Sequence, residues 1–489
     1  MDGVVGDNLS REELLTLVGE LRQQNAALLR RVAELEREVS QLRSQLAAAL
    51  KNSSTSSKPP SSDIVKPPKN GGSSGPGGGG GTGEPRRRIG GQPNHPKHER
   101  PAFRPDQVDR IRTHTRKRCP DCGGRLRPGR EPPRVVQQVE LVARPVRVTE
   151  HRVPGCWCAR CGVTHFASLP PDVAAGGLLG PRLTTLVAYL KSACHASFST
   201  IRTFLRDCVG LTVSRGYLAK VIRKVAHLLR EPYNDLLRRL PRQKSVRADE
   251  TGHPENKRRL WTWCFRAKRF TLFHVAESRG ADVLFDVLGR MFRGVLSCDY
   301  YSAYRKYMKD ADIRVQFCLA HLIRELKYLT TLPDGPTRDY GERLLAGMRQ
   351  LFGIIHRRET MSERRFIEAL ADQRERILQE AQTAVPPTRE ARNLAMRLQR
   401  HGEAYFEFIT TPHIEPTNNL AEQAIRFVVI DRRITQGTRG PAGRRWCERI
   451  WTVLATCAQQ HRSAFDYIHA AVRAFFQHQP APMLLNDTS

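Results

Sequence analysis

A change from helical to strand-like patterning after Pro241 constrains the fold of this chain more than any other feature. Five short runs rich in β-branched and aromatic residues follow, and a helical pattern separates the third run from the fourth. The runs are residues 245–249, 260–266, 270–276, 295–299 and 314–318, with the helical pattern at 281–290. Adjacent strands, a helix and then further strands predict a mixed α/β sheet.

Acidic residues stand at the ends of two of these runs, and a third lies far downstream. The first and fourth runs end in Asp249 and Asp299, whereas Glu422 lies on a predicted helix. Neighbouring strand ends can bring the two aspartates together. Taken singly, each acid is explained by a helix cap or a solvated charge. Three carboxylates together suit a site that holds divalent metal ions against a phosphodiester, because Mg²⁺ prefers hard oxygen ligands.

Helix phase supports the placement of Glu422. Asn418, Glu422 and Arg426 recur every four residues and form one polar stripe. An apolar stripe runs beside it through Ala421, Ile425 and Val428. A helix anchored by that stripe would aim Glu422 away from the core. Arg426 could orient Glu422 or contact phosphate, or it could form a surface ion pair of little energetic value.

The charge of the chain points to a polyanionic partner. Its 489 residues carry 80 Lys and Arg against 49 Asp and Glu, a formal net charge of +31. This excess favours nucleic acid, and the length predicts several domains. No run approaches the roughly 18 apolar residues of a membrane span, and the polar N-terminal stretch differs from a secretory signal. We therefore expect a cytoplasmic, DNA-facing protein.

Residues 10–50 carry a heptad repeat. One seam position holds Leu14, Leu21, Leu28, Leu35 and Leu42. The other holds Val18, Asn25, Val32, Val39 and Leu46. β-branched residues at one position with leucine at the other favour a parallel two-stranded coiled coil, and the single Asn25 would fix its register. We expect a homodimer; an amphipathic helix packed on the body of the protein is the alternative.

Residues 51–105 predict a flexible linker. They are rich in Ser, Pro, Gly and basic residues, and such a composition cannot bury a core. The later part, residues 86–100, is strongly basic. This basic stretch could follow phosphates along a groove, or it could form a solvated tail.

Two Cys-x-x-Cys pairs, each followed by Gly, predict a structural zinc ribbon in residues 106–170. Strand-like runs at 135–142 and 146–153 predict a hairpin between the two pairs. Cys156 could replace Cys158 as a ligand or be a bystander. Four thiolates complete the tetrahedral coordination of Zn²⁺ and contribute to folding rather than to catalysis. The expected ligands are Cys119, Cys122, Cys158 and Cys161.

Residues 178–240 have helical patterns, and two of these helices match a helix-turn-helix. The first ends near Cys208, Gly210 interrupts the pattern, and Ser214 is a suitable N-cap for the second. The second helix carries the basic residues Arg215, Lys220, Arg223 and Lys224. In so basic a chain we expect the pair to contact DNA; two ordinary packing helices are the alternative.

The order of these motifs resembles that of DDE transposases of the insertion sequence 66 family, over nearly the whole chain. The resemblance rests on the heptad repeat, residues 52–63, Gly90-Gly-Gln-Pro93, the cysteine pairs, Asp249-Glu-Thr251, Asp299 and Asn418-Asn-Leu-Ala-Glu422. It implies a ribonuclease-H-like catalytic core in residues 241–335 and 410–475, interrupted by a helical insertion at 336–409.

The resemblance also implies a chemistry. Asp249, Asp299 and Glu422 would form the acidic triad, and Mg²⁺ or Mn²⁺ would be the catalytic cofactor. Asp249 is the candidate for a ligand that bridges two ions, and each of the other acids would complete one ion. The substrates would be double-stranded DNA at the ends of an insertion sequence and at the target. Companion proteins encoded by the element would be possible partners.

Two positions depart from the family pattern. Thr417 stands where the family often has Asp, and Gln423 stands where Arg is common. Because the three acids are retained, we expect a transposase that cleaves and transfers DNA strands. A domesticated, non-catalytic DNA-binding regulator is one alternative, and a nuclease of the same fold without strand transfer is another.

Neighbouring residues are weaker candidates. Glu250 is expected to be solvated or to support the metal ligands from behind. His321 could contact the scissile phosphate or be a buried structural histidine. Trp261 and Trp263 are expected in the core or on a sheet face. Residues 432–445 resemble a Gly-rich basic loop, which could contact phosphate or simply be solvated.

Overall fold

The computed structural model describes most of the chain outside the linker. The described residues are 11–49, 102–114, 120–123, 125, 135–139, 141–142, 145–160 and 163–485. The basic stretch at 86–100, Cys119 and Cys161 lie outside them. The chain divides into two compact units, residues 1–68 with 152–489 and residues 69–151. No helix in the described part is long and apolar enough to cross a membrane.

A single helix, α1 (Arg11–Ala49), covers the predicted heptad repeat. The structure therefore has the helix that the repeat predicts. Its seam is exposed: Leu21, Leu28 and Val32 keep 55%, 64% and 50% of their surface. An exposed apolar seam of this length is typical of an interaction surface. The homodimer itself stays a prediction.

A short antiparallel hairpin, β1 (Gly155–Cys158) and β2 (Val163–Phe166), spans the second cysteine pair. The strands predicted at 135–142 and 146–153 are wrong, because the described residues of both runs form no strand. Their valines stay in solvent, with Val136 and Val148 each 90% exposed. Pairing of these two runs would bury no apolar face and would therefore gain little stability. The strands that do pair are β1 and β2.

Five helices lie between the β1–β2 hairpin and the central sheet in the described residues, and two of them lie where the sequence predicts the helix-turn-helix. They are α3 (Pro171–Gly176), α4 (Pro181–Ser192), α5 (Phe198–Val209), α6 (Arg215–Leu228) and α7 (Arg230–Arg239). Gly210 ends α5 in the left-handed conformation, with φ 72°. The Ser214 hydroxyl accepts the Tyr217 N–H and caps α6.

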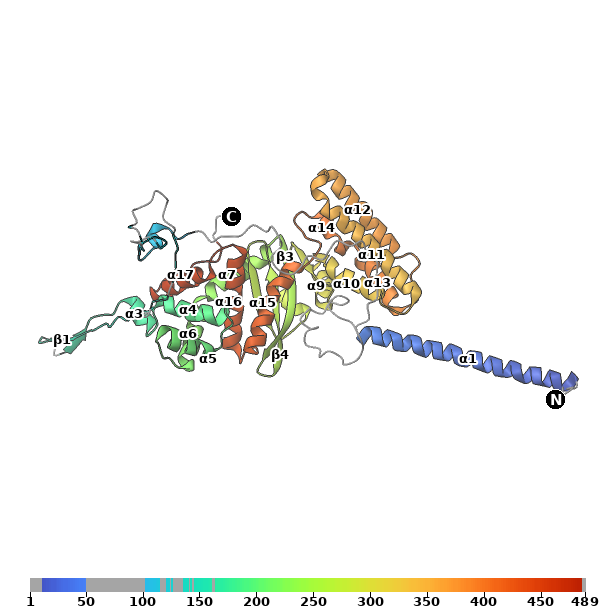
Figure 1. The fold of residues 1–489 in the computed structure, drawn as a ribbon, viewed down its shortest axis with the longest axis horizontal. Helices are drawn as coiled ribbons and strands as arrows, with labels where there is room; N and C mark the ends of the chain where they lie inside the picture. The colour runs from blue at the N-terminus through green and yellow to red at the C-terminus, as the bar shows by residue number, and fades with distance from the viewer. Residues whose placement is uncertain are drawn as a thin grey trace. The chain divides into compact units, whose positions relative to one another are not determined.

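A five-stranded mixed sheet forms after these helices (Figure 1). Its strand order is β5-β4-β3-β6-β7, with β4 and β5 antiparallel to their neighbours and β6 and β7 parallel to β3. The strands are β3 (Ser245–Glu255), β4 (Arg258–Arg266), β5 (Thr271–Ala276), β6 (Val295–Cys298) and β7 (Arg314–Phe317). Helix α8 (Ala281–Leu288) follows β5, and α9 (Ser302–Ala311) follows β6. The predicted mixed α/β sheet is confirmed.

The first strand is longer than predicted. It does not end at Asp249 but continues to Glu255, because β4 pairs with it from Arg247 to Glu255. The polar residues beyond Asp249 find partners inside the protein: His253 lies between the hydroxyls of Thr262 (3.1 Å) and Thr438 (3.0 Å). Asp249 therefore lies in the middle of a strand.

Helices cover both faces of the sheet. Along β3 the side chains alternate between faces, and Thr251, on the face of Asp249, accepts a hydrogen bond from Arg432 of α15. Helix α15 packs on this face against β3 and β4, and α16 lies along the edge strand β5, where Thr452 accepts the Phe273 N–H (Figure 1). On the opposite face, Tyr304 of α9 donates to Glu250. The last three helices are α15 (Asn419–Thr435), α16 (Pro441–Gln459) and α17 (Ala464–Phe476).

The segment between β7 and α15 is helical. It contains α10 (Leu319–Leu329), α11 (Gly335–His356), α12 (Glu363–Glu380), α13 (Arg389–His401) and α14 (Glu407–Thr410). The basic loop predicted at 432–445 is wrong in its extent, because α15 continues to Thr435 and α16 begins at Pro441. Only residues 436–440 turn the chain, with Gln436 and Gly437 at positive φ.

Candidate active site

The parallel pairing of β3 and β6 aligns the two aspartates. Arg247 is the register partner of Ser297, so two residues further along each strand Asp249 and Asp299 stand at the same height. Asp249 is half-buried, and its carboxylate accepts the Glu250 N–H at 2.9 Å. Asp299 lies just beyond β6 and accepts the Tyr301 N–H at 2.9 Å. The structure therefore brings together the two acids that the strand pattern selected.

The three predicted acids act on one another electrostatically. Burial raises the pKa of Asp249 well above its ordinary range, and the charges of Glu250, Asp299 and Glu422 raise it further. Burial also raises the pKa of Asp299 to about 6, with a further contribution from Glu250. A group of carboxylates that repel one another is stabilised when a cation binds among them.

Glu422 reaches this cluster because the start of α15 is hydrogen-bonded to the middle of β3 and to the residues that begin α10. The Asn418 side chain donates through Nδ2 to the Ala248 carbonyl at 2.8 Å, directly before Asp249. The Asn418 backbone N–H donates to Cys318 Sγ at 3.2 Å, and the Leu319 N–H donates to the Pro416 carbonyl at 2.9 Å. Asn418 is 2% exposed. These bonds tie α15 to β3 and to the start of α10.

Two side chains of α10 face the Glu422 carboxylate. His321 Nδ1 lies 3.6 Å from Glu422 Oε1, and Arg324 Nη2 lies 3.6 Å from Oε2. Burial lowers the pKa of His321, which favours the neutral imidazole. Arg426, for which orientation of Glu422, phosphate contact and a surface ion pair were all open, is exposed, whereas Arg324 contacts Glu422. His321 thus lies beside Glu422, and both roles considered for it, contact with the scissile phosphate and a buried structural histidine, stay predictions.

Glu250 does not lie in solvent, which was one of the two environments expected for it. Its side chain is buried, and Arg279 Nε and Nη2 donate to its Oε1 at 2.9 and 2.8 Å. The Tyr304 hydroxyl donates to Oε2 at 2.5 Å. The Arg279 guanidinium also lies 3.8 Å above the Tyr301 ring. Arg279 lowers the pKa of Asp299, so this buried ion pair moderates the negative charge of the cluster.

The donor set fits divalent cations. Within the described residues, Glu422 Oε1 and Asn418 Oδ1 are buried oxygens without a hydrogen-bond partner. Buried oxygens left unpaired are costly, and a cation in the cluster would satisfy them. Asp249, Asp299 and Glu422 supply the carboxylate oxygens that Mg²⁺ and Mn²⁺ prefer.

Four residues around the acids were not predicted from the sequence to be part of the site: Arg279, Tyr304, Cys318 and Arg324. The spacing Cys318-x-x-His321-x-x-Arg324 places three functional side chains on one side of a helix, and this signal was present in the sequence. No sequence signal connects Arg279 or Tyr304 to Glu250, because they come from separate elements. Trp263 is buried as expected, and Trp261 lies under Arg279, with the guanidinium 4.6 Å from its ring.

The described residues include only part of the predicted zinc ribbon. Cys122 and Cys156 are exposed and Cys158 is partly exposed, while the two remaining cysteines of the predicted ribbon lie outside the described residues. The zinc ribbon therefore stays a prediction, as does the choice between Cys156 and Cys158.

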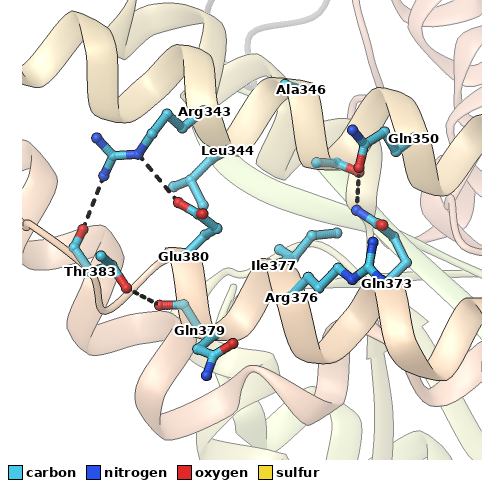
Figure 2. Close-up of a pocket in the computed structure, with 11 residues that line it drawn as sticks. Arg343, Leu344, Ala346, Gln350, Gln373, Arg376, Ile377, Gln379, Glu380 and Thr383 are labelled. Carbon is cyan, nitrogen blue, oxygen red and sulfur yellow. Dashed lines mark hydrogen bonds and ion pairs between the residues drawn. The ribbon is translucent and has the colours of Figure 1, made fainter.

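A cavity of about 380 Å³ lies between α11 and α12 (Figure 2). Arg343 contacts Glu380 at 3.2 Å and donates to the Thr383 carbonyl at 3.0 Å. Gln373 donates to the Gly347 carbonyl at 3.0 Å. These lining groups satisfy one another across the two helices. The cavity shares no residue with the acid cluster, and we assign it no part in the chemistry.

The mixed sheet, the aligned aspartates and the glutamate on α15 define an α/β protein with a clustered carboxylate site. A family model described as "Transposase IS66 family" matches residues 176–445, more than half of the chain and all three acids. The chain belongs to the IS66 transposase family. It is also 25% identical over 379 residues to "Uncharacterized protein y4qI" of Sinorhizobium fredii (strain NBRC 101917 / NGR234), covering 71% of this chain and 68% of that protein. Family membership implies a protein that binds and cuts DNA with divalent metal ions.

Proposed function

We propose that this protein is a transposase that cleaves DNA at the ends of an insertion sequence and transfers the freed strand to target DNA. The observation that carries the proposal is the convergence of Asp249, Asp299 and Glu422 from β3, β6 and α15 into one electrostatically linked cluster. A regulator that only binds DNA gains nothing from carboxylates that repel one another and the phosphates.

In this proposal the three acids hold the ions and the surrounding residues hold the acids. Divalent ions supply an activated water and neutralise the charge that develops on the phosphate. Asn418 fixes α15 against β3, and Arg324 and His321 fix the direction of the Glu422 carboxylate. The same site would first direct water at one DNA strand and then direct the freed 3′-hydroxyl at the target.

We also propose that the core is ribonuclease-H-like. The order β5-β4-β3-β6-β7 supports this assignment, with three antiparallel strands first in sequence and two parallel strands beside β3. The position of the first acid in the middle of β3 and of the second just after β6 supports it as well. The helices of residues 336–409, α11 to α14, would then be the insertion.

DNA would be held in part by α6. Arg215, Lys220 and Arg223 are exposed on this helix, as a helix that contacts DNA requires. Lys224 differs, because its ammonium lies over the Phe476 ring at 5.2 Å. Three of the four predicted cations are thus available to phosphates. The coiled-coil homodimer and the zinc ribbon complete the proposal.

The test is a strand-cleavage assay with DNA that carries the element ends, run with Mg²⁺ or Mn²⁺ and the full chain. Asp299→Asn is expected to abolish cleavage and to keep DNA binding in a mobility-shift assay. Asp286→Asn, an exposed aspartate on α8, is the matched control and is expected to cleave normally. Normal cleavage by Asp299→Asn would overturn the catalytic assignment, and cleavage without joining by the wild type would identify a nuclease.

A further inference from the structure

A thiol lies beside the proposed catalytic glutamate. Cys318 Sγ, one nitrogen of the His321 ring and one carboxylate oxygen of Glu422 lie within 4.8 Å of one another. Cys318 is buried at the start of α10, and His321 follows it after one helical turn. This arrangement brings a sulfur, a nitrogen and an oxygen donor to one point.

Two of these donor atoms lack a partner among the described residues. His321 Nδ1 and Glu422 Oε1 are both buried without a hydrogen bond, although only 3.6 Å separates them. Buried polar atoms are nearly always paired in folded proteins. Two unpaired donors that face the same point indicate that something else binds between them.

The spacing of the donors suits a tetrahedral metal ion. Bond lengths of about 2.0–2.3 Å place neighbouring ligands of Zn²⁺ roughly 3.3–3.7 Å apart. The His321 to Glu422 distance of 3.6 Å already has this value. The sulfur has to approach by at most about 1 Å, which a side-chain rotation provides.

The chemistry of the donors selects the ion. Mg²⁺ binds oxygen and avoids sulfur, whereas Zn²⁺ and Co²⁺ bind thiolate, imidazole and carboxylate together. We propose that Cys318, His321 and Glu422 form a binding site for a thiophilic divalent ion such as Zn²⁺. Binding releases the thiol proton of Cys318 to solvent and leaves a fourth coordination position open.

The site has a consequence for the proposed reaction. Glu422 cannot serve Zn²⁺ through Oε1 and remain free to orient around a catalytic Mg²⁺, so the two ions compete for it. Zn²⁺ would therefore inhibit strand cleavage. The competition rests on the proposed function, whereas the binding of the thiophilic ion does not.

Binding is tested with Co²⁺ as the probe, on the full chain. Wild type is expected to show the near-ultraviolet absorption of a Co²⁺–thiolate bond in excess of that of Cys318→Ser, by one ion per chain. The serine hydroxyl can still accept the Asn418 N–H and cap α10, so the fold is retained. Cys208→Ser, an exposed cysteine on α5, is the matched control and is expected to behave as wild type. His321→Ala is expected to lose the same ion.

The second measurement is Zn²⁺ inhibition of Mg²⁺-supported cleavage, with each variant compared with itself in the absence of Zn²⁺. Cys318→Ser is expected to need at least about tenfold more Zn²⁺ for half-inhibition than wild type, the loss of one strong ligand. Equal Co²⁺ spectra and stoichiometry in wild type and Cys318→Ser would overturn the site and leave Cys318 as a helix cap. Equal Zn²⁺ inhibition would overturn the competition. A wild type that binds the ion through Cys318 but cuts no DNA would leave the metal site standing and refute the proposed function.

Discussion

The two aspartates and the glutamate reach the same cluster by different structural means. Asp249 and Asp299 are placed by the backbone register of two neighbouring parallel strands. Glu422 follows a long helical segment and is placed by side-chain contacts, from Asn418 to Ala248 and from α10 to its carboxylate. Backbone pairing is hard to change by one substitution, whereas a side-chain tether is lost when one residue is replaced.

This difference separates residues that bind ions from residues that place them. Substitution of one of the three acids should abolish strand cleavage without changing the fold. Substitution of Asn418 or Arg324 should leave all three acids present and impair only the helix-borne one. Variants of each kind therefore test whether the cluster is assembled as the contacts indicate.

The largest effect is expected for Asp249→Asn. Removal of the carboxylate proposed to bridge two ions should lower cleavage by about 10³-fold or more, since metal ions contribute several kcal/mol to the transition state. Strand-cleavage rates at saturating Mn²⁺ measure this effect. Cleavage within a few-fold of wild type would show that Asp249 is no ligand.

A smaller effect is expected for Asn418→Ala. The substitution leaves the buried Ala248 carbonyl without its donor, which costs about 1–3 kcal/mol, and loosens α15 at the turn that carries Glu422. Cleavage should fall by about 10–100-fold. Asn419→Ala is the control, because the neighbouring asparagine is exposed. If both alanine variants cleave alike, α15 is held by other contacts.

The pH dependence of stability tests the strand-borne pair. The pKa of Asp299 is raised from 3.8 to about 6 in the folded protein, mainly by burial. Ionisation of this carboxyl therefore costs stability as the pH rises through that interval, and the cost is complete above about pH 6. Asp299→Asn removes the charge and keeps an acceptor for the Tyr301 N–H.

Chemical denaturation at several pH values measures this cost. Asp299→Asn should be about 1–2 kcal/mol more stable than wild type at pH 7 without metal, after allowance for partial exposure. The gain should vanish below about pH 4, where Asp299 is protonated in both states. A gain that is independent of pH would exclude charge as its source.

The smallest effect is expected for Arg324→Gln. The ion pair with Glu422 is partly exposed, so its loss should reduce cleavage by only about two- to fivefold, mainly through a higher Mg²⁺ requirement. Arg426→Gln, on the same helix as Glu422, should have no effect. The Mg²⁺ concentration for half-maximal cleavage distinguishes the two. A stronger effect of Arg426→Gln would restore that residue as the partner of Glu422.

The sequence predicted the strands and the acids because these signals are local. The predicted end of β3 was wrong, since Gly252 and Pro254 around Thr251 and His253 are typical of a turn. The latter two remain in the strand because Arg432 and Thr438, far along the chain, contact them. The burial of Glu250 could not be predicted for the same reason. Its partners Arg279 and Tyr304 lie 29 and 54 residues further along the chain.

The predicted hairpin shows the opposite error. The runs at 135–142 and 146–153 have the composition of strands, but Val136 and Val148 remain 90% exposed. Composition describes what a strand would need, and only a buried face makes the strand form. Contacts between residues far apart in the sequence determine whether β3 continues and whether the hairpin forms. A single sequence does not show these contacts.

Direct counting of bound Mn²⁺ tests the central claim, that the strand-borne pair and the helix-borne glutamate form one ion site. Electron paramagnetic resonance of the full chain titrated with Mn²⁺ reports free and bound ion without any DNA. We expect weaker Mn²⁺ binding in Asp249→Asn, Asp299→Asn and Glu422→Gln, and unchanged Mn²⁺ binding in Asp286→Asn. Wild-type Mn²⁺ binding by Glu422→Gln would contradict it, because Glu422 would then lie beside the site and not in it.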